Sequence, residues 1–190
     1  MNSSQVVLIT GSSTGFGRLF TETLARKGHA VFATMRDPGG RNAENSAEIR
    51  TLAQKESLPI HVLELDVTDD ASVGRAVDAA VAKAGRIDVA INNAGYYLGG
   101  LAEAVTTEQA QRLMDTNFLG PVRVNRAVLP HMRRQRGGLL MQASITRVID
   151  AVNYKCNRIV SAANRERDLY KSHLPAVSAS RRLASPLAGG

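Results

Sequence analysis

Short apolar runs alternate with helix-like segments through the first 140 residues of this 190-residue chain. The runs are rich in β-branched residues and nearly continuous in apolar character, which is typical of strands covered by helices on both faces. This alternation predicts a parallel α/β sheet. The predicted strands are Val6–Thr10, Ala30–Met35, Ile60–Val67, Ile87–Asn92 and Leu139–Ala143. The predicted helices are Gly15–Lys27, Ala43–Glu56, Asp70–Ala84 and a long segment that breaks near Asn117–Pro121 and ends at Arg134.

The positive charge of the chain is concentrated near its C-terminal end. The formal net charge is +7, yet residues 1–140 hold 16 basic and 14 acidic side chains, whereas residues 141–190 hold 8 and 3. The basic residues of that segment are not interleaved with aromatic residues, as a nucleic-acid stacking surface would require. No helix-turn-helix or zinc-ligand spacing accompanies them. We therefore expect a solvated basic segment and no specific nucleic-acid partner.

Cysteine content and hydropathy bear on the compartment. Cys156 is the single cysteine, so no internal disulfide can form, and a reducing compartment fits. No stretch approaches the roughly 20 apolar residues of a membrane span. The N-terminal residues MNSSQVVLIT include no basic region, and their apolar run is too short for a signal peptide. These features predict a cytoplasmic protein without a membrane partner.

The turn between the first predicted strand and helix reads TGSSTGFG and is rich in glycine. Such a turn aims the N-terminus of the helix at whatever lies over the loop, where free N–H groups and the helix dipole attract a phosphate. Gly11 permits the turn, Gly15 lets a pyrophosphate approach the backbone, and Gly17 allows close helix–strand packing. Ser13 and Phe16 complete the predicted binding set of this turn. Taken alone, the glycines are also compatible with a packing device that binds no ligand.

Two further motifs follow predicted strands at the edge where parallel sheets bind ligands. Asp66 ends the third strand, where its carboxylate could accept a hydrogen bond from an adenine amino group, and the N–H of Val67 could meet the ring. The fourth strand ends in a motif with small residues where a ribose would lie, namely Asn92, Asn93, Ala94 and Gly95. Taken singly, Asp66 could be a helix cap and the asparagine pair a plain turn.

These motifs together resemble the short-chain dehydrogenase/reductase family over about residues 5–144. The resemblance rests on the glycine turn, Asp66-Val67, the NNAG motif and Asn117 within MDTNFLGPVRVNRAVLP. It implies a Rossmann-type doubly wound sheet that binds NAD or NADP and transfers hydride between the cofactor and a small carbonyl or alcohol. It also implies that Asn117 lies at a helix kink and holds a water in a proton relay. A homo-oligomer is the family expectation, which the divergent C-terminal end of this chain puts in doubt.

The residues after the second predicted strand indicate which cofactor is preferred. An acidic residue there accepts from the ribose 2′-OH of NAD, whereas an arginine accommodates the 2′-phosphate of NADP. Arg36 occupies this place and favours NADP, with Asp37 beside it as a competing signal for NAD. The alternative interpretation is that Arg36 only points into solvent.

The catalytic half of the resemblance is incomplete. Family members use a serine after the fifth strand, a tyrosine proton donor and a lysine four residues beyond that tyrosine. Ser144 matches the serine, but no tyrosine of this sequence is followed by lysine at that spacing. Tyr154 with Arg158 is the nearest imitation, and it lies closer to Ser144 than the family's spacing allows. The resemblance places Tyr96–Leu98 in the substrate pocket.

Beyond Ser144 the sequence changes character. We predict a dinucleotide-binding domain over residues 1–145 and a divergent basic segment over residues 146–190, so that the sheet is incomplete at its C-terminal end. Two functions stay open, ahead of a third, the binding of anions or nucleic acid through the basic segment. The first is an NADP-dependent oxidoreductase, with NAD as the other possible cofactor. The second is a non-catalytic or truncated nucleotide-binding remnant of the same family.

Overall fold

A twisted, mostly parallel sheet forms the centre of the molecule. The computed structural model describes residues 4–98, 104–143 and 156–157. The strand order is β3-β2-β1-β4-β5-β6, in which β1 to β5 are parallel and β6 pairs antiparallel with β5. The strands are β1 (Val6–Ile9), β2 (Ala30–Met35), β3 (Ile60–Glu64), β4 (Val89–Asn92), β5 (Leu139–Ala143) and β6 (Cys156–Asn157). The predicted doubly wound parallel sheet is confirmed, and the two-residue strand β6 was not predicted.

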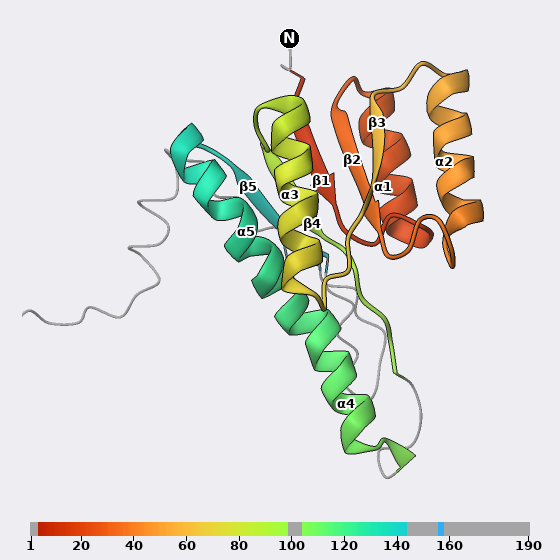
Figure 1. Ribbon diagram of the computed structural model, residues 1–190, viewed down its shortest axis with the longest axis vertical. Coiled ribbons are helices and arrows are strands. Elements are labelled where there is room, and N and C mark those ends of the chain that lie inside the picture. Colours follow the sequence, from red (N-terminus) through yellow and green to blue (C-terminus); the bar gives the residue numbers. More distant parts are fainter. Residues whose placement is uncertain (1–3, 99–103, 144–155, 158–190) are drawn as a thin grey trace, which may run out of the picture.

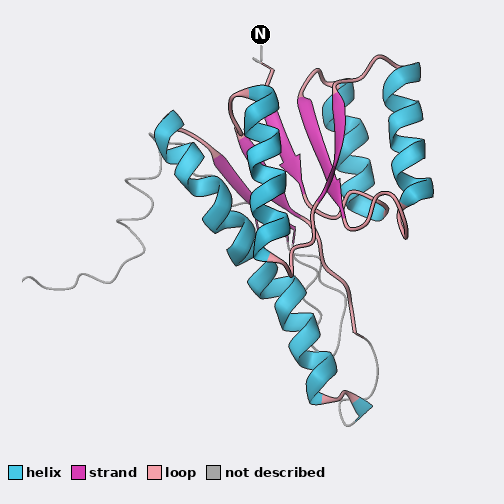
Figure 2. Ribbon diagram, in the orientation of Figure 1, coloured by secondary structure: helices cyan, strands magenta, loops and turns pink. Residues whose placement is uncertain are grey.

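Helices cover both faces of this sheet (Figures 1 and 2). Helices α1 and α2 lie on one face, and α3 and α5 lie on the other. Helix α4 extends beyond the sheet as a continuation of α5 (Figure 1). The helices are α1 (Gly15–Arg26), α2 (Ala43–Lys55), α3 (Asp70–Ala84), α4 (Thr107–Met114), the π-helix η2 (Asp115–Leu119) and α5 (Gly120–Gln135). No helix in the described ranges is long and apolar enough to span a bilayer.

Neighbouring residues of each central strand enter different cores. Leu8 and Phe32 point toward α3 and α5, whereas Val7, Ile9 and Val31 point toward α1 and α2. All five are at most 1% exposed. This follows from the two-residue period of a strand, and it explains why β1 is apolar at every position and β2 at every position but Thr34.

The third strand is shorter than its apolar pattern predicts. β3 ends at Glu64, not at Val67, although Leu65 N still donates to Met35 O at 2.9 Å. The chain then turns, because Asp66 Oδ1 accepts hydrogen bonds from the N–H and the hydroxyl of Thr68 at 2.9 and 2.8 Å. Leu65 and Val67 stay buried in the core next to α3 and so keep the apolar pattern beyond the strand.

The predicted break near Asn117–Pro121 is a π-helical turn within a continuous helix. Residues Asp115–Leu119 form η2, and α5 follows without an intervening loop. Pro121 stands in the first turn of α5. Proline lacks an N–H, so it is tolerated where the α-helical hydrogen-bond pattern is already interrupted.

Candidate functional site

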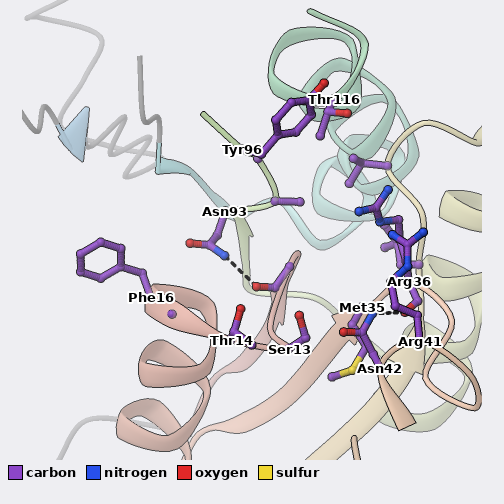
Figure 3. Close-up of a pocket in the computed structure, with 16 residues that line it drawn as sticks. Ser13, Thr14, Phe16, Met35, Arg36, Arg41, Asn42, Asn93, Tyr96 and Thr116 are labelled. Carbon is purple, nitrogen blue, oxygen red and sulfur yellow. Dashed lines mark hydrogen bonds between the residues drawn. The ribbon is translucent and has the colours of Figure 1, made fainter. Parts of the chain in front are cut away.

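An open pocket of about 350 Å³ lies at the carboxyl ends of β1, β2 and β4 (Figure 3). Nine of the twelve residues predicted to bind a cofactor line it, because the motifs follow parallel strands that end at this edge of the sheet. These nine are Gly11, Ser13, Gly15, Phe16, Arg36, Val67, Asn93, Ala94 and Gly95. Three predicted residues do not line it, namely Gly17, Asp66 and Asn92. Lining residues that the sequence reasoning missed include Thr14, Met35, Arg41, Asn42, Leu65 and Thr116.

The three glycines of the turn have different surroundings. A Cβ at Gly17 would overlap the carbonyl oxygen of Gly11, so α1 begins in direct contact with the end of β1. Gly11 has a φ of +68°, and a Cβ there would lie 2.8 Å from Ala94 Cα. Gly15 has a φ of +58°, and its Cβ position meets no atom within 4 Å. Gly15 therefore leaves space on the pocket side of the turn.

The turn is fastened to the end of β4 by two polar side chains. Thr10 Oγ1 accepts hydrogen bonds from the N–H groups of Asn93 and Ala94, both at 3.0 Å. Asn93 Nδ2 donates to the carbonyl of Thr10 at 2.9 Å and to that of Gly11 at 3.0 Å, the second of which is drawn in Figure 3. Thr10 is only 1% exposed. The side-chain amide of Asn93 thus holds the glycine turn in shape, while the residue itself lines the pocket.

Asn92 lies away from the pocket. Its side chain is buried, and Nδ2 donates to Asn125 Oδ1 of α5 at 2.8 Å. Successive residues of a strand point to opposite faces, so Asn92 and Asn93 take different tasks although they are neighbours. Asn92 joins β4 to α5 in the described structure.

Asp66 is half-buried beside the pocket, while its neighbours Leu65 and Val67 line the pocket. Its Oδ1 is engaged by Thr68, and its own N–H donates to Ser72 Oγ at 2.9 Å. Asp66 is not the N-cap of α3. The N-cap is Asp69, whose side chain accepts a hydrogen bond from Ala71 N. The proposed contact of Asp66 with an adenine amino group remains a prediction.

Two arginines stand at the β2 end of the pocket. Arg36 follows β2 directly, and Arg41 precedes α2. Both are exposed and line the pocket, and neither guanidinium has an ion pair or hydrogen bond with another described residue (Figure 3). Arg41 was missed because a residue six positions after the strand carries no recognisable motif. Its only signal was a second positive charge just before a predicted helix.

Asn117 lies on η2, next to the pocket-lining Thr116, and its side-chain amide is bound to the main chain. Its Oδ1 accepts from Tyr96 N at 3.1 Å, and its Nδ2 donates to Tyr96 O at 2.8 Å. Gly95 leaves room for this contact, because a Cβ there would lie 3.1 Å from Asn117 Oδ1. The other predicted catalytic residues, Ser144 and Tyr154, lie outside the described residues.

Arg123 of α5 anchors the π-helical turn. Its Nη2 contacts Asp115 Oδ1 at 2.7 Å, and its Nη1 donates to Val67 O at 3.2 Å. The hydrogen bond with Asp115 raises the pKa of Arg123 above the usual arginine value. η2 is thereby tied to the loop after β3, which forms one wall of the pocket.

Comparison with known proteins agrees with this geometry. The sequence profile described as short chain dehydrogenase matches residues 5–153. The chain belongs to this family. The Rossmann-type sheet and the pocket at its carboxyl edge are therefore those of a short-chain dehydrogenase.

Individual relatives match about three quarters of the chain. The 3-ketodihydrosphingosine reductase of Bacteroides thetaiotaomicron is 40% identical over 140 residues, which is 74% of this chain and 46% of that protein. A short-chain dehydrogenase structure from Streptomyces avermitilis has a TM-score of 0.65 at 32% identity and covers 74% of this chain and 49% of that one. A gluconate 5-dehydrogenase from Burkholderia cenocepacia, solved with NADP and tartrate, has a TM-score of 0.65 at 28% identity over 75% of this chain and 56% of that one. The chain spans about half the length of the curated relatives it matches.

Proposed function

We propose that this short-chain dehydrogenase binds NADP(H) in the pocket and transfers hydride between it and a small carbonyl or alcohol. The observation that carries the proposal is the pairing, in one pocket, of an open glycine turn with an unpaired arginine beyond β2. The first feature fits a pyrophosphate, and the second fits an additional phosphate on the adenosine ribose.

The pyrophosphate would lie against Gly15 and the first turn of α1. That turn contains no acidic side chain, and Thr14 at its N-cap forms no capping hydrogen bond through its side chain. The N-terminal end of α1 therefore presents partial positive charge to the pocket without a competing anion from its own first turn.

The adenosine would lie at the ends of β2 and β3. Leu65 and Val67 offer apolar surface there, and Arg36 offers a cation to a 2′-phosphate. A guanidinium binds phosphate with two hydrogen bonds in a fixed geometry, so NADP is the preferred cofactor and NAD the alternative. The Burkholderia relative solved with NADP supports this preference.

NADP(H), when bound, supplies or accepts the hydride. The chain must then hold the substrate oxygen and move a proton, and we assign these tasks to Ser144 and Tyr154, with Asn117 holding a water. An ordinary tyrosine has a pKa near 10, so a proton donor at neutral pH needs neighbouring positive charge. No lysine stands four residues beyond any tyrosine of this sequence. That observation favours a second candidate function, dinucleotide binding without turnover.

A matched pair of glycine variants tests the binding site. Gly15 and Gly28 both have positive φ, +58° and +85°, and at neither would a Cβ meet an atom within 4 Å. Gly28 follows α1 at the end that is remote from the pocket, so both variants strain the backbone but only Gly15→Val places methyl groups at the pyrophosphate. We expect Gly15→Val to weaken NADPH binding several-fold in a fluorescence titration, while Gly28→Val binds as the wild type does. Equal affinities of the two variants would place the pyrophosphate elsewhere.

Replacement of Arg36 tests the cofactor preference. A charge-assisted hydrogen bond contributes about 1.5–3 kcal/mol, so Arg36→Ala should weaken NADPH binding roughly tenfold or more. NADH lacks the 2′-phosphate, and its affinity should change little. Equal losses for both cofactors would show that Arg36 has a structural role only.

Turnover separates the two candidate functions. The experiment is NADPH oxidation with a panel of ketones and quinones, for the wild type and Tyr154→Phe. Turnover that Tyr154→Phe abolishes would establish the oxidoreductase and make Tyr154 its proton donor. NADPH binding without turnover would establish the second candidate.

A further inference from the structure

The loop between β2 and α2, residues 36–42, is folded around the carboxylate of Asp37. Asp37 has a φ of 44°, in the left-handed region that non-glycine residues seldom adopt. Its Oδ2 accepts the backbone N–H of Arg41 at 2.8 Å, and its carbonyl accepts the N–H of Asn42 at 3.0 Å. Asn42 Nδ2 in turn donates to the carbonyl of Arg36 at 2.6 Å. These bonds bring the two ends of the loop together.

Gly40 makes this fold possible. A Cβ at Gly40 would lie 2.5 Å from Oδ2 and 2.6 Å from Oδ1 of Asp37. The Asp37 carboxylate therefore occupies the space that the missing side chain of Gly40 leaves, and it faces the loop. Any larger residue at position 40 would push the carboxylate away from Arg41 N.

The folded loop brings a second cation to the pocket. Arg41 lines the pocket together with Arg36, and Figure 3 draws both guanidiniums at the same end. Asp37 engages only the main chain of Arg41, so the Arg41 guanidinium keeps no ion pair with a described residue. Two unpaired guanidiniums beside each other repel, and a doubly charged anion between them would remove that repulsion.

We propose that Asp37 and Gly40 are positioning residues that present Arg41 beside Arg36 as a second contact to the 2′-phosphate of NADP. This inference rests on the proposed function. It also removes the conflict between Arg36, which favours NADP, and its neighbour Asp37, which by itself would favour NAD. Asp37 does not act as an acceptor for the ribose 2′-OH of NAD, because its carboxylate shapes the loop that binds the 2′-phosphate.

Two arginine variants test the contact itself. Arg41→Ala should weaken NADPH binding about tenfold and leave NADH binding within about twofold of the wild type. Arg50→Ala is the matched control, because Arg50 is an exposed arginine of α2 that does not line the pocket. Adenosine 2′,5′-bisphosphate serves as a second probe that carries the 2′-phosphate without the nicotinamide half, and its affinity should fall with that of NADPH.

Two aspartate variants test the positioning role. Asp37→Ala removes the acceptor of Arg41 N and should lower the NADPH affinity several-fold, with little effect on NADH. Asp37→Asn keeps an acceptor oxygen and should restore most of the NADPH affinity. A residue that only stabilises the fold would change both cofactors alike, and a ribose acceptor would change NADH. Thermal unfolding of each variant shows that the sample is folded.

The outcomes separate this inference from the proposed function. If Arg36→Ala discriminates NADPH from NADH but Arg41→Ala behaves as Arg50→Ala does, the inference is wrong and the proposed function stands. If Arg41→Ala discriminates but Asp37→Asn fails to rescue, the positioning role of Asp37 is wrong. If the wild type binds neither dinucleotide nor the bisphosphate, both proposals are wrong.

Discussion

The glycine turn after β1 and the loop of residues 36–42 after β2 line the same pocket, but they use main chain and side chains in opposite ways. In the turn, the side chains of Thr10 and Asn93 are consumed by internal hydrogen bonds, and the backbone at Gly15 faces the open space. In the loop, Asp37 and Asn42 bind the main chain, and the arginine side chains face the pocket.

Under the proposed function, the turn binds the part that both cofactors share, and the loop selects between NADP and NAD. A pyrophosphate is common to NAD and NADP, and it suits a backbone site that is built into the buried ends of β1 and β4. The 2′-phosphate distinguishes the two cofactors, and side chains on an exposed loop can be exchanged with little effect on the core. Thr10 and Ser12 of the turn are at most 1% exposed, whereas Arg36, Asp37 and Arg41 are exposed.

The largest effect that we expect from a single methyl group falls in the glycine turn. Gly17→Ala places a Cβ against the carbonyl of Gly11 and 2.5 Å from Asn93 Nδ2, and backbone cannot yield as a flexible side chain can. We expect a loss of about 3 kcal/mol in the free energy of unfolding, at the upper end for an overpacked site. Urea denaturation measures it.

Gly15→Ala is the control for this variant. Its Cβ meets no atom within 4 Å, so only the left-handed φ is penalised, at about 1–2 kcal/mol. Equal losses of unfolding free energy for Gly15→Ala and Gly17→Ala would show that backbone conformation, and not contact with the end of β1, determines the destabilisation in the turn.

A smaller effect is expected at Thr10, where the methyl-for-hydroxyl exchange keeps the shape. Thr10→Val leaves the N–H groups of Asn93 and Ala94 without their acceptor at a buried site. We expect a loss of about 2 kcal/mol, because an unsatisfied buried donor costs roughly 1–3 kcal/mol. Thr10→Ser keeps the oxygen and should recover most of the stability. A serine variant as unstable as the valine variant would assign the effect to packing.

The smallest effect is expected on the side of the loop. Ser46 of α2 donates its hydroxyl to Pro38 O at 2.9 Å and is 4% exposed. Ser46→Ala should reduce the free energy of unfolding by about 1 kcal/mol, as the loss of one ordinary hydrogen bond does. NADPH affinity should change less than in Arg41→Ala, because the bonds through Asp37 and Asn42 remain. A loss larger than that of Thr10→Val would show that the loop is as integral to the core as the turn is.

Much of the fold was predictable from periodicity and turn chemistry. β2 and β5 have the predicted bounds, and α3 has both of its predicted ends. β3 was predicted too long, because Leu65 and Val67 are apolar for reasons of core packing and not of strand pairing. The break before Pro121 was located correctly, but the sequence did not show that a π-helical turn, anchored by Arg123, would keep the helix continuous.

The site was predictable where a motif acts through its backbone and less so where it acts through side chains. The glycine turn, Val67 and NNAG brought eight predicted residues to the pocket, and Arg36 after β2 is the ninth. Asn92 and Asn93 were both predicted to bind the cofactor. Because side chains alternate along β4, Asn92 contacts α5, whereas Asn93 contacts the glycine turn. The sequence did not predict that Arg41 lines the pocket, because the position of Arg41 depends on how the Asp37 carboxylate folds the loop.

The sequence by itself determined the order of strands and helices, the position of the glycine turn and the edge of the sheet at which a ligand would bind. These properties follow from local dihedral preferences and the period of apolar residues, which neighbouring positions encode. The tertiary structure decided which polar groups meet: Thr10 with Asn93, 83 positions apart, and Asp37 with the backbone of Arg41. A hydrogen bond depends on distances of a few tenths of an ångström, and only the packed sheet and the folded loop set those distances.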